Sequence, residues 1–313
     1  MTKIIAEFCQ NHLGNREILK NMILAAKSSG ATYAKIQGLY SWELTKRIEF
    51  ENPSSQIYRP FKKEFDRLKL LDLSFETEVW FVEECKRNSI IPMITVFSHN
   101  GIGRALDAGF KHIKIASYDC ASIPLIKQIL KFASEVVIST GATYWSEIEA
   151  TANFLRENKA DDQEITFLHA TTIYPTNLEE VALLKMLLLK TFGFNIGYSD
   201  HTSLKSSGLT ASKAAILLGA QYIERHFTIL DASDTKDGPI SIGPSDLAEL
   251  IEFSKYSKSV QLQQLDLSRH SQLFFLSSIE PSDQELANRS YYRGRVASVI
   301  NGKDYFAWQE VQY

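Results

Sequence analysis

Eight short β-rich runs alternate with helix-length amphipathic segments through most of this chain. The runs are residues 3–8, 33–37, 91–96, 112–116, 135–139, 165–169, 194–199 and 221–226. Strands that are separated by helices pair in parallel, because each helix returns the chain to the same end of the sheet. Eight such units match the number in a (β/α)8 TIM barrel, so the sequence predicts an α/β fold of that kind.

A doubly wound sheet is the alternative arrangement of alternating strands and helices. That fold usually has fewer strands, and a glycine-rich phosphate turn often follows its first strand. In this chain the sequence EFCQNH, residues 7–12, stands at that place instead. The barrel is therefore the favoured fold.

Helix signals support the same alternation. Residues 15–29 carry one apolar face, with Asn15 as the expected N-cap and Gly30 as the expected C-terminal stop. Ser74 precedes another amphipathic segment whose acidic first turn suits a helix N-terminus.

Two segments interrupt the alternation. Residues 38–73 form a long connection rich in Pro, Asn, Ser and charge, and connections of that length are usually functional lids or partner surfaces. Beyond about residue 260 the chain is too short for another substantial core, although Asn301-Gly302 predicts one β-hairpin. We expect a barrel domain at 1–260 and a C-terminal extension at 261–313, packed on the barrel or on a neighbouring subunit.

Composition limits the classes of partner. The 313 residues carry a net charge of -3, with no basic domain to hold nucleic acid and no apolar run as long as a membrane span. The three cysteines, Cys9, Cys85 and Cys120, are widely separated and odd in number, so no disulfide framework is implied. We expect a cytoplasmic protein that binds neither nucleic acid nor membrane.

Two histidines stand near the ends of the last two predicted strands. His201 and His226 are separated by a helix-length apolar stretch, so a barrel places both rings at one mouth. Two convergent imidazoles with few other protein ligands suit a partly hydrated divalent metal better than a closed zinc site. The alternative is a pair of hydrogen-bonded core histidines, and Asp200 could orient one ring. His12 and His169 also end strands, so the number of histidines does not choose the ligands.

Polar side chains stand at the ends of all the predicted strands, where barrel enzymes carry their catalytic groups. They are Glu7, Asn11, His12, Lys35, Gln37, Thr95, Ser98, Lys114, Ser117, Asp119, Ser139, Thr140, His169, Thr171, Thr172, Tyr174, Ser199, Asp200, His201, Glu224, Arg225 and His226. Among the carboxylates, Glu7 and Asp119 end strands and are expected to face the cavity, whereas Asp237 lies in a turn-like loop.

Lys35 and Lys114 lie within strands that are otherwise apolar. A lysine inside a barrel is costly unless an anion accompanies it. Together with hydroxyl side chains, the two lysines would form a cradle for phosphate and carboxylate. The alternatives are a structural pair between one lysine and Glu7 or Glu224, and Schiff-base chemistry by one lysine.

Taken together, these motifs resemble the sialic acid synthase family, the N-acetylneuraminate synthases. The similarity covers about residues 3–260 in the family's order and includes NH at 11–12, STG at 139–141, YP at 174–175, GYSDHT at 197–202 and ERHFT at 224–228. The resemblance implies metal-dependent condensation of phosphoenolpyruvate with an aldose, such as an N-acetylated hexosamine, to a nonulosonic 2-keto-3-deoxy sugar acid with release of phosphate.

The resemblance also implies roles for individual residues. His201 and His226 would bind a divalent metal, usually Mn(II), with Mg(II) or Co(II) as alternatives. Phosphoenolpyruvate would be held by Lys35, Thr95, Lys114, Ser117, Ser139, Thr172 and Ser199. Glu7, Gln37, Tyr174 and Asp237 would lie near the sugar. Asp119 stands where the family has a glutamate that manages the attacking water, and the catalytic set would be Asp119, Glu7 and Lys114.

The chain departs from the family pattern at three places. Ala116-Ser117-Tyr118-Asp119 replaces the usual Gly-Ser-Gly-Glu, and Val96 replaces a proline. The third departure is that the chain is too short for the C-terminal antifreeze-like domain, whose arginine reaches into the partner subunit's site. Arg289, Arg293 and Arg295 lie in the extension, but no motif chooses one as the substitute. A homodimer is expected from the resemblance alone.

Two other functions stay open at this point. One is a pyruvate-using barrel aldolase or lyase with the same cleft, which would release no phosphate. The other is a non-catalytic barrel that binds ligands and relies on a separate protein for the missing domain.

Overall fold

The computed structural model describes residues 2–311, and its first eight strands close into one parallel barrel in chain order. The strands are β1 Lys3–Cys9, β2 Tyr33–Gly38, β3 Ile91–Val96, β4 His112–Ile115, β5 Glu135–Ser139, β6 Glu164–Ala170, β7 Asn195–Asp200 and β8 Tyr222–His226. The predicted TIM barrel is confirmed, and each predicted strand lies within a residue of the observed one at either end.

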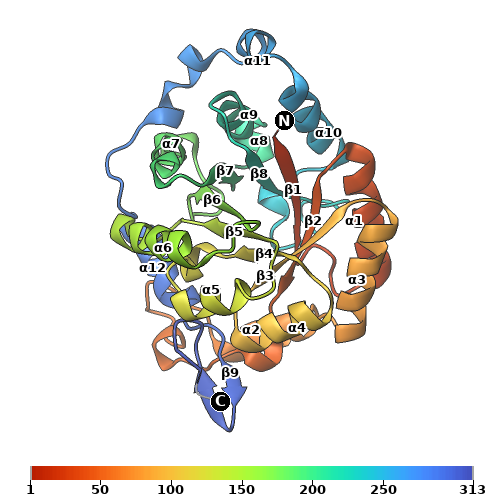
Figure 1. Ribbon diagram of the computed structural model, residues 1–313, viewed down its shortest axis with the longest axis vertical. Coiled ribbons are helices and arrows are strands. Elements are labelled where there is room, and N and C mark those ends of the chain that lie inside the picture. Colours follow the sequence, from red (N-terminus) through yellow and green to blue (C-terminus); the bar gives the residue numbers. More distant parts are fainter. Residues whose placement is uncertain (1, 312–313) are drawn as a thin grey trace.

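Helices surround the barrel (Figure 1). They are α1 Arg16–Ser29, α2 Phe61–Lys69, α3 Phe75–Arg87, α4 His99–Asp107, α5 Ile123–Ile129, α6 Trp145–Asn158, α7 Leu184–Leu189, α8 Leu204–Ser207, α9 Thr210–Leu217, α10 Pro244–Lys255, α11 Lys258–Gln264 and α12 Asp283–Tyr292. The apolar faces of these helices pack on the outward side chains of the strands and make the main hydrophobic core.

The predicted helix ends are confirmed. The Asn15 side chain accepts hydrogen bonds from the backbone N–H groups of Glu17 and Ile18, and Gly30 ends α1 in the left-handed conformation with φ 96°. Ser74 caps α3 by accepting from the backbone N–H of Thr77.

Inside the barrel the side chains form layers, because every second residue of a strand points inward. An apolar layer of Ile5, Tyr33, Met93, Val137, Leu168 and Tyr222 fills the middle. Below it, the buried Glu135 carboxylate accepts hydrogen bonds from Tyr33 and Tyr222 and lies 2.7 Å from His112. The interior is therefore packed shut at the amino ends of the strands, which leaves the carboxyl ends as the open mouth.

The C-terminal extension packs against this mouth. After α11 the chain returns along the outside of the barrel, and α12 and the final hairpin lie at the same end as α2 (Figure 1). Arg289 of α12 pairs with Glu147 at the start of α6, and Leu44 of the long connection forms a bridge with Val296. The extension and the 38–73 connection thus meet over the strand ends.

The final hairpin has the turn that its sequence predicts. Strands β9 Ser298–Ile300 and β10 Lys303–Tyr305 pair antiparallel across Asn301 and Gly302, whose φ values are 51° and 73°. Positive φ at both central residues is the pattern of a type I′ turn, which Asn-Gly favours.

A buried ion pair joins the last two strands on the outward side of the barrel. Arg225 and Asp200 are fully buried and lie 2.8 Å apart, and Asp200 also accepts hydrogen bonds from Ser212 and the backbone N–H of Thr202. Asp200 is thus committed to Arg225 and its neighbours, so the expectation that it orients a histidine ring is wrong.

Within residues 2–311, no helix is both long and apolar enough to cross a bilayer.

Arg225→Met should lower the free energy of unfolding by about 3–5 kcal/mol, because the Asp200 charge stays buried without its partner. Lys62→Met is the matched control, because it breaks an exposed pair with Asp66 and should change stability little. Denaturant titration of both variants measures the difference. Equal losses in the two variants would contradict a dominant role for the buried pair.

Candidate active site

A buried charge network forms the floor of the mouth. The Lys35 ammonium from β2 lies 2.5 Å from Glu7 of β1 and 2.7 Å from Glu224 of β8. Burial alone would lower the pKa of Lys35, but Glu224 and Glu7 raise it above its ordinary value. Burial would likewise raise the pKa of Glu224, yet Lys35 and Lys114 hold it below its ordinary value. Lys35 and Glu224 are therefore charged at neutral pH.

Lys114 from β4 is in a different state. Its ammonium donates to Ser139 Oγ at 2.6 Å and to the Ile115 carbonyl at 3.0 Å, without a carboxylate in direct contact. Burial lowers the pKa of Lys114 to about 8, although the charge of Glu224 opposes this. Its positive charge is thus the less neutralised of the two and the more available to an incoming anion.

Above this floor lies a cavity of about 290 Å³. It is lined by twelve of the fourteen residues expected from the sequence, and these come from seven of the barrel strands and from the loops that follow strands. These twelve are Glu7, Lys35, Gln37, Thr95, Lys114, Ser117, Ser139, Tyr174, Ser199, His201, His226 and Asp237. Two lysines and four small hydroxyl side chains in one concave site make a suitable cradle for a multiply charged anion.

The two mouth histidines lie together, with ring centroids 5.5 Å apart. His201 Nδ1 lies 2.8 Å from the Thr171 carbonyl, so Nδ1 carries the hydrogen and Nε2 keeps a free lone pair. Burial, followed by the charge of His226, lowers the pKa of His201 to about 4, which keeps its ring neutral. Neutral imidazole is the form that ligates a metal.

Two further donors stand beside His226. Ligand atoms of Cys9, His226 and Asp237 all lie within 4.8 Å of one another, and the Cys9 thiol donates to Asp237 at 2.7 Å. Buried His226 Nδ1 has no hydrogen-bond partner among residues 2–311. An unsatisfied imidazole nitrogen next to sulfur and carboxylate donors fits a divalent transition metal.

The sequence reading missed Cys9 as a donor, because the cysteines were considered only for disulfides. Within the described chain all three cysteines are free thiols. The signal was present, since side chains two residues apart on a strand share a face and Glu7 was expected to point inward.

The remaining strand-end histidines have structural partners. His12 Nδ1 accepts from the backbone N–H of Gly14 at 3.0 Å, and His169 Nε2 lies 2.7 Å from the Val181 carbonyl. Neither residue lines the cavity. The structure therefore separates these two histidines from His201 and His226, which the sequence alone could not do.

Two expected site residues lie outside the main cavity. Thr172 is buried, and its backbone N–H and hydroxyl donate to Glu285 of α12 at 3.1 and 3.3 Å. Asp119 lines a smaller adjoining cavity under the extension, together with Trp308. Burial raises the pKa of Asp119 to about 7, although Arg293 acts in the opposite direction. Tyr118 lines both cavities and stands between them.

Aromatic side chains shape the upper wall of the cavity. Tyr118, the bulky departure from the family pattern, stacks on Tyr292 of α12 with ring centroids 4.7 Å apart. Tyr174 packs against His201 at 4.5 Å. The extension therefore supplies part of the site wall, which no sequence motif indicated.

Four basic residues line the outer edge of the cavity, and they are Arg59, Arg67, Lys236 and Arg295. The first three were not predicted from the sequence, whereas Arg295 was one of the three arginines named as possible substitutes for that of the antifreeze-like domain. Arg59 and Arg67 belong to the long connection that was expected to act as a lid or partner surface. The length of this connection indicated a functional segment, but it did not indicate which of its residues reach the site.

A family model and several known proteins match this chain. The protein-family model described as "NeuB family" matches residues 22–263. N,N'-diacetyllegionaminic acid synthase of Campylobacter jejuni is 34% identical over 259 residues, which is 80% of this chain and 74% of that protein. The Legionella pneumophila enzyme of the same name is 28% identical and covers 93% of this chain and 78% of its own.

Among solved structures, the spore coat polysaccharide biosynthesis protein spsE of Bacillus subtilis is similar with a TM-score of 0.74. The identity is 23%, and the match covers 93% of this chain and 77% of that one. At this low identity the similarity shows a shared fold and nothing more.

Lys35→Met should destabilise the protein increasingly as the pH rises from about 5 to about 8. Without the ammonium, repulsion between Glu7 and Glu224 raises the pKa of one carboxyl. The folded variant then binds a proton that the unfolded chain has released, so its stability falls with pH.

Denaturant titration of Lys35→Met and the parent at both pH values measures this effect, with exposed Lys62→Met as the control. A deficit that is the same at the two pH values would contradict the assigned charge states.

Proposed function

The chain belongs to the NeuB family, and from this premise we propose that it is a metal-dependent synthase that condenses phosphoenolpyruvate with an aldose. The product is a 2-keto-3-deoxy sugar acid of the nonulosonic type, and phosphate is released. The acceptor is an N-acetylated hexosamine or a derivative of one. The Campylobacter and Legionella relatives, both named as synthases of such an acid, support this assignment.

One observation carries the proposal. Side chains of seven of the eight barrel strands, together with residues of the loops that follow the strands, converge on a single cavity that combines a cationic, hydroxyl-rich floor with a neighbouring group of metal donors. The floor suits an anion, and the donors suit a metal that binds the carbonyl oxygen of the second reactant. The two reactants can thus be held side by side.

Phosphoenolpyruvate binds at the floor in this proposal. Lys114 provides the less neutralised positive charge, while Ser139, Thr95 and Ser117 supply hydroxyl hydrogen bonds. Lys35 contributes through its fixed position between Glu7 and Glu224. Thr172 lies outside the cavity and gives both of its donors to Glu285, so the proposal assigns it no direct contact with phosphoenolpyruvate.

The aldose binds above the floor, near Gln37, Tyr174 and Asp237. His201 and His226 hold the divalent metal, Mn(II) or alternatively Mg(II) or Co(II), with Cys9 and Asp237 as neighbouring donors. When bound, the metal supplies a Lewis acid for the aldehyde oxygen.

The chain's own groups direct the remaining chemistry. C3 of phosphoenolpyruvate forms a bond to the aldehyde carbon, which leaves a cationic C2 that water captures. Asp119 accepts one proton of that water, and the bond from C2 to the bridging oxygen breaks, so that phosphate leaves with this oxygen while the C2 hydroxyl becomes the keto group. The two protons of the water end on the former aldehyde oxygen, which becomes a hydroxyl, and on the released phosphate. Asp119 lines the adjoining cavity, and Tyr118 borders both cavities.

The setting of the reaction follows from the resemblance. The proposal places the enzyme in the cytoplasm as a homodimer, with phosphoenolpyruvate and an aldose as its partners and with no nucleic acid or membrane surface. The non-catalytic alternative, which needs a separate protein to complete the site, has no structural observation in its favour.

A pyruvate aldolase is the second candidate, because Lys114 has the lowered pKa that Schiff-base lysines need. Its ammonium, however, donates two hydrogen bonds, of 2.6 and 3.0 Å, that favour the charged form of the lysine. The synthase therefore accounts for more of the site.

The proposed function predicts aldose-dependent release of phosphate from phosphoenolpyruvate with Mn(II). His226→Ala should weaken Mn(II) binding by more than about 10–100-fold, the loss typical when only a hydrogen-bond partner of a metal ligand is removed, and should remove turnover while the protein stays folded. His270→Ala, outside the cavity, is the control. Pyruvate-dependent turnover without phosphate would establish the aldolase instead, and unchanged Mn(II) binding in His226→Ala would contradict the metal assignment.

The pH profile tests the role of Asp119. A general base must be deprotonated, so kcat/KM should rise with pH through about 7, the pKa that burial gives Asp119. Asp119→Asn should lose this rising limb and fall by about 10²–10⁴-fold in rate. An unaltered profile in Asp119→Asn would show that another group accepts the proton.

A further inference from the structure

A group of cations surrounds one carboxylate at the outer edge of the site, and we call it the rim cluster. Its members are Arg59, Arg67, Lys236 and Arg295, whose nitrogens lie 3.7, 3.0, 4.0 and 3.0 Å from the carboxylate oxygens of Glu64. They come from the long connection, helix α2, the loop after β8 and the C-terminal extension. Three separate segments, the long connection with its helix α2, the loop after β8 and the extension, thus bring positive charge to one place.

Glu64 alone does not balance this charge. One carboxylate faces four cations, and the Lys236 ammonium at 4.0 Å is too far for a hydrogen bond. The buried Nε atoms of Arg67 and Arg295 have no hydrogen-bond partner among the described residues. Burial and the charge of Arg67 lower the pKa of Lys236 to about 8, despite the opposing effect of Glu64.

Contacts with an aromatic ring and a side-chain amide hold the three arginines of the cluster in place. The guanidinium carbons of Arg59 and Arg295 lie 5.8 and 5.5 Å from the Tyr292 ring centroid, and Arg67 also donates to Gln10 at 2.6 Å. Stacking and hydrogen bonding of this kind fix the direction of a guanidinium. The surplus charge is therefore preorganised and faces the cavity.

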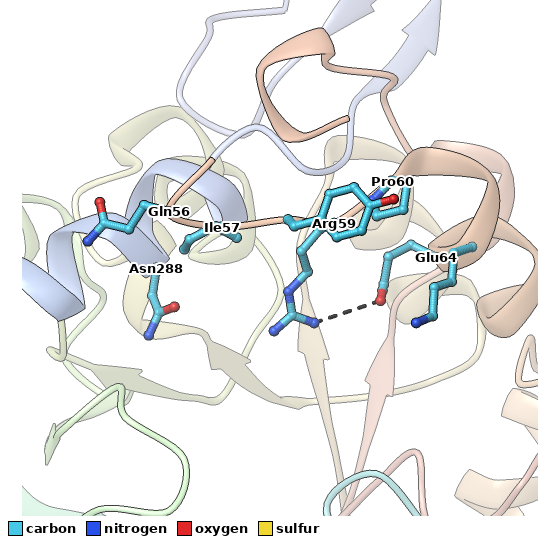
Figure 2. A pocket seen from close by; sticks show the side chains of 8 residues that line it. Gln56, Ile57, Arg59, Pro60, Glu64 and Asn288 are labelled. Atoms are coloured by element: carbon cyan, nitrogen blue, oxygen red, sulfur yellow. Dashed lines mark ion pairs between the residues drawn. The ribbon is translucent and has the colours of Figure 1, made fainter. Parts of the chain in front are cut away.

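All four members line the main cavity, and Arg59 also lines a second cavity of about 350 Å³ at the rim. Figure 2 shows the Arg59 guanidinium between Asn288 and Glu64, with the ion pair to Glu64 dashed. Lys236 directly precedes Asp237, whose carboxylate lies beside His226. A molecule whose carbonyl lies at the histidines can therefore extend toward the cluster.

Phosphoenolpyruvate does not account for these cations. The floor already offers Lys114 and the serine and threonine hydroxyls, and the rim cluster lies on the outer side of the same cavity. The acceptor occupies the outer side in the function proposed above.

We propose that the acceptor aldose carries an anionic group, a phosphate or a carboxylate, at the end remote from its aldehyde, and that the rim cluster binds this group. The inference rests on the proposed synthase function. It deepens that function by assigning the chemical class of the acceptor.

The test compares three acceptors: a 2-acetamido-2-deoxyhexose, its 6-phosphate, and the corresponding hexuronic acid. Phosphate release is measured with phosphoenolpyruvate and Mn(II). One of the two anionic acceptors should exceed the neutral sugar in kcat/KM by about tenfold or more, the value of a hydrogen bond to a charged group, and which one does so identifies the anion.

Lys236→Gln and Arg59→Gln should each lower this preference by about tenfold and leave the KM for phosphoenolpyruvate unchanged within about twofold. Lys62→Gln removes an exposed positive charge from α2, outside the cavity, and should alter neither quantity. The effect of the two cluster variants should also shrink at high salt.

Three results would overturn the inference: a preference for the neutral sugar, a preference that survives Lys236→Gln and Arg59→Gln, or a rise in the KM for phosphoenolpyruvate instead. Turnover of the neutral sugar alone would leave the synthase function intact. If no acceptor is turned over, the proposed function fails, and calorimetric binding of the hexose 6-phosphate and the hexuronic acid decides the inference. Binding of neither anion more tightly than the neutral sugar, or equal binding by Lys236→Gln, would then overturn it.

Discussion

The Lys35 ammonium between Glu7 and Glu224 is the interaction on which the upper layer of this barrel depends. It links strands β1, β2 and β8, where the sheet closes on itself, and lies within hydrogen-bond distance of Thr95 on β3. Buried ion pairs add little net stability, but breaking one is costly, so the group fixes an arrangement more than it strengthens it. Because Lys35 is already neutralised, Lys114 is the cation left for an incoming anion.

The same constraint shapes the rest of the site. Parallel strands send their carboxyl ends to one mouth, so small polar residues of distant segments become neighbours. The apolar layer and the Glu135 network seal the other end. Over the open end, the long connection and the C-terminal extension meet, and both contribute to the rim cluster around Glu64. The floor is thus built by the barrel, and the outer half by additions to it.

The sequence predicted the barrel, the helix caps and the hairpin because these depend on local periodicity and turn chemistry. It also predicted most of the residues that line the cavity, since strand-end positions imply a shared mouth. It could not separate His201 and His226 from His12 and His169, because the ring nitrogens of the latter two contact backbone groups of loops whose course depends on the fold. Asp200 and Thr172 pair with Arg225 and Glu285, and Arg295 reaches Glu64 from the far end of the chain, and no local pattern encodes these pairings.

In the proposed reaction, the cavity joins phosphoenolpyruvate to an aldose, water then attacks C2, and the C2–oxygen bond breaks. Phosphoenolpyruvate labelled with ¹⁸O at the bridging oxygen tests this most directly, with mass spectrometry of the released phosphate and of the sugar acid. The account predicts that the label leaves with phosphate and that the product gains three carbons. Label retained in the keto acid, or phosphate released at the same rate without an aldose, would contradict it.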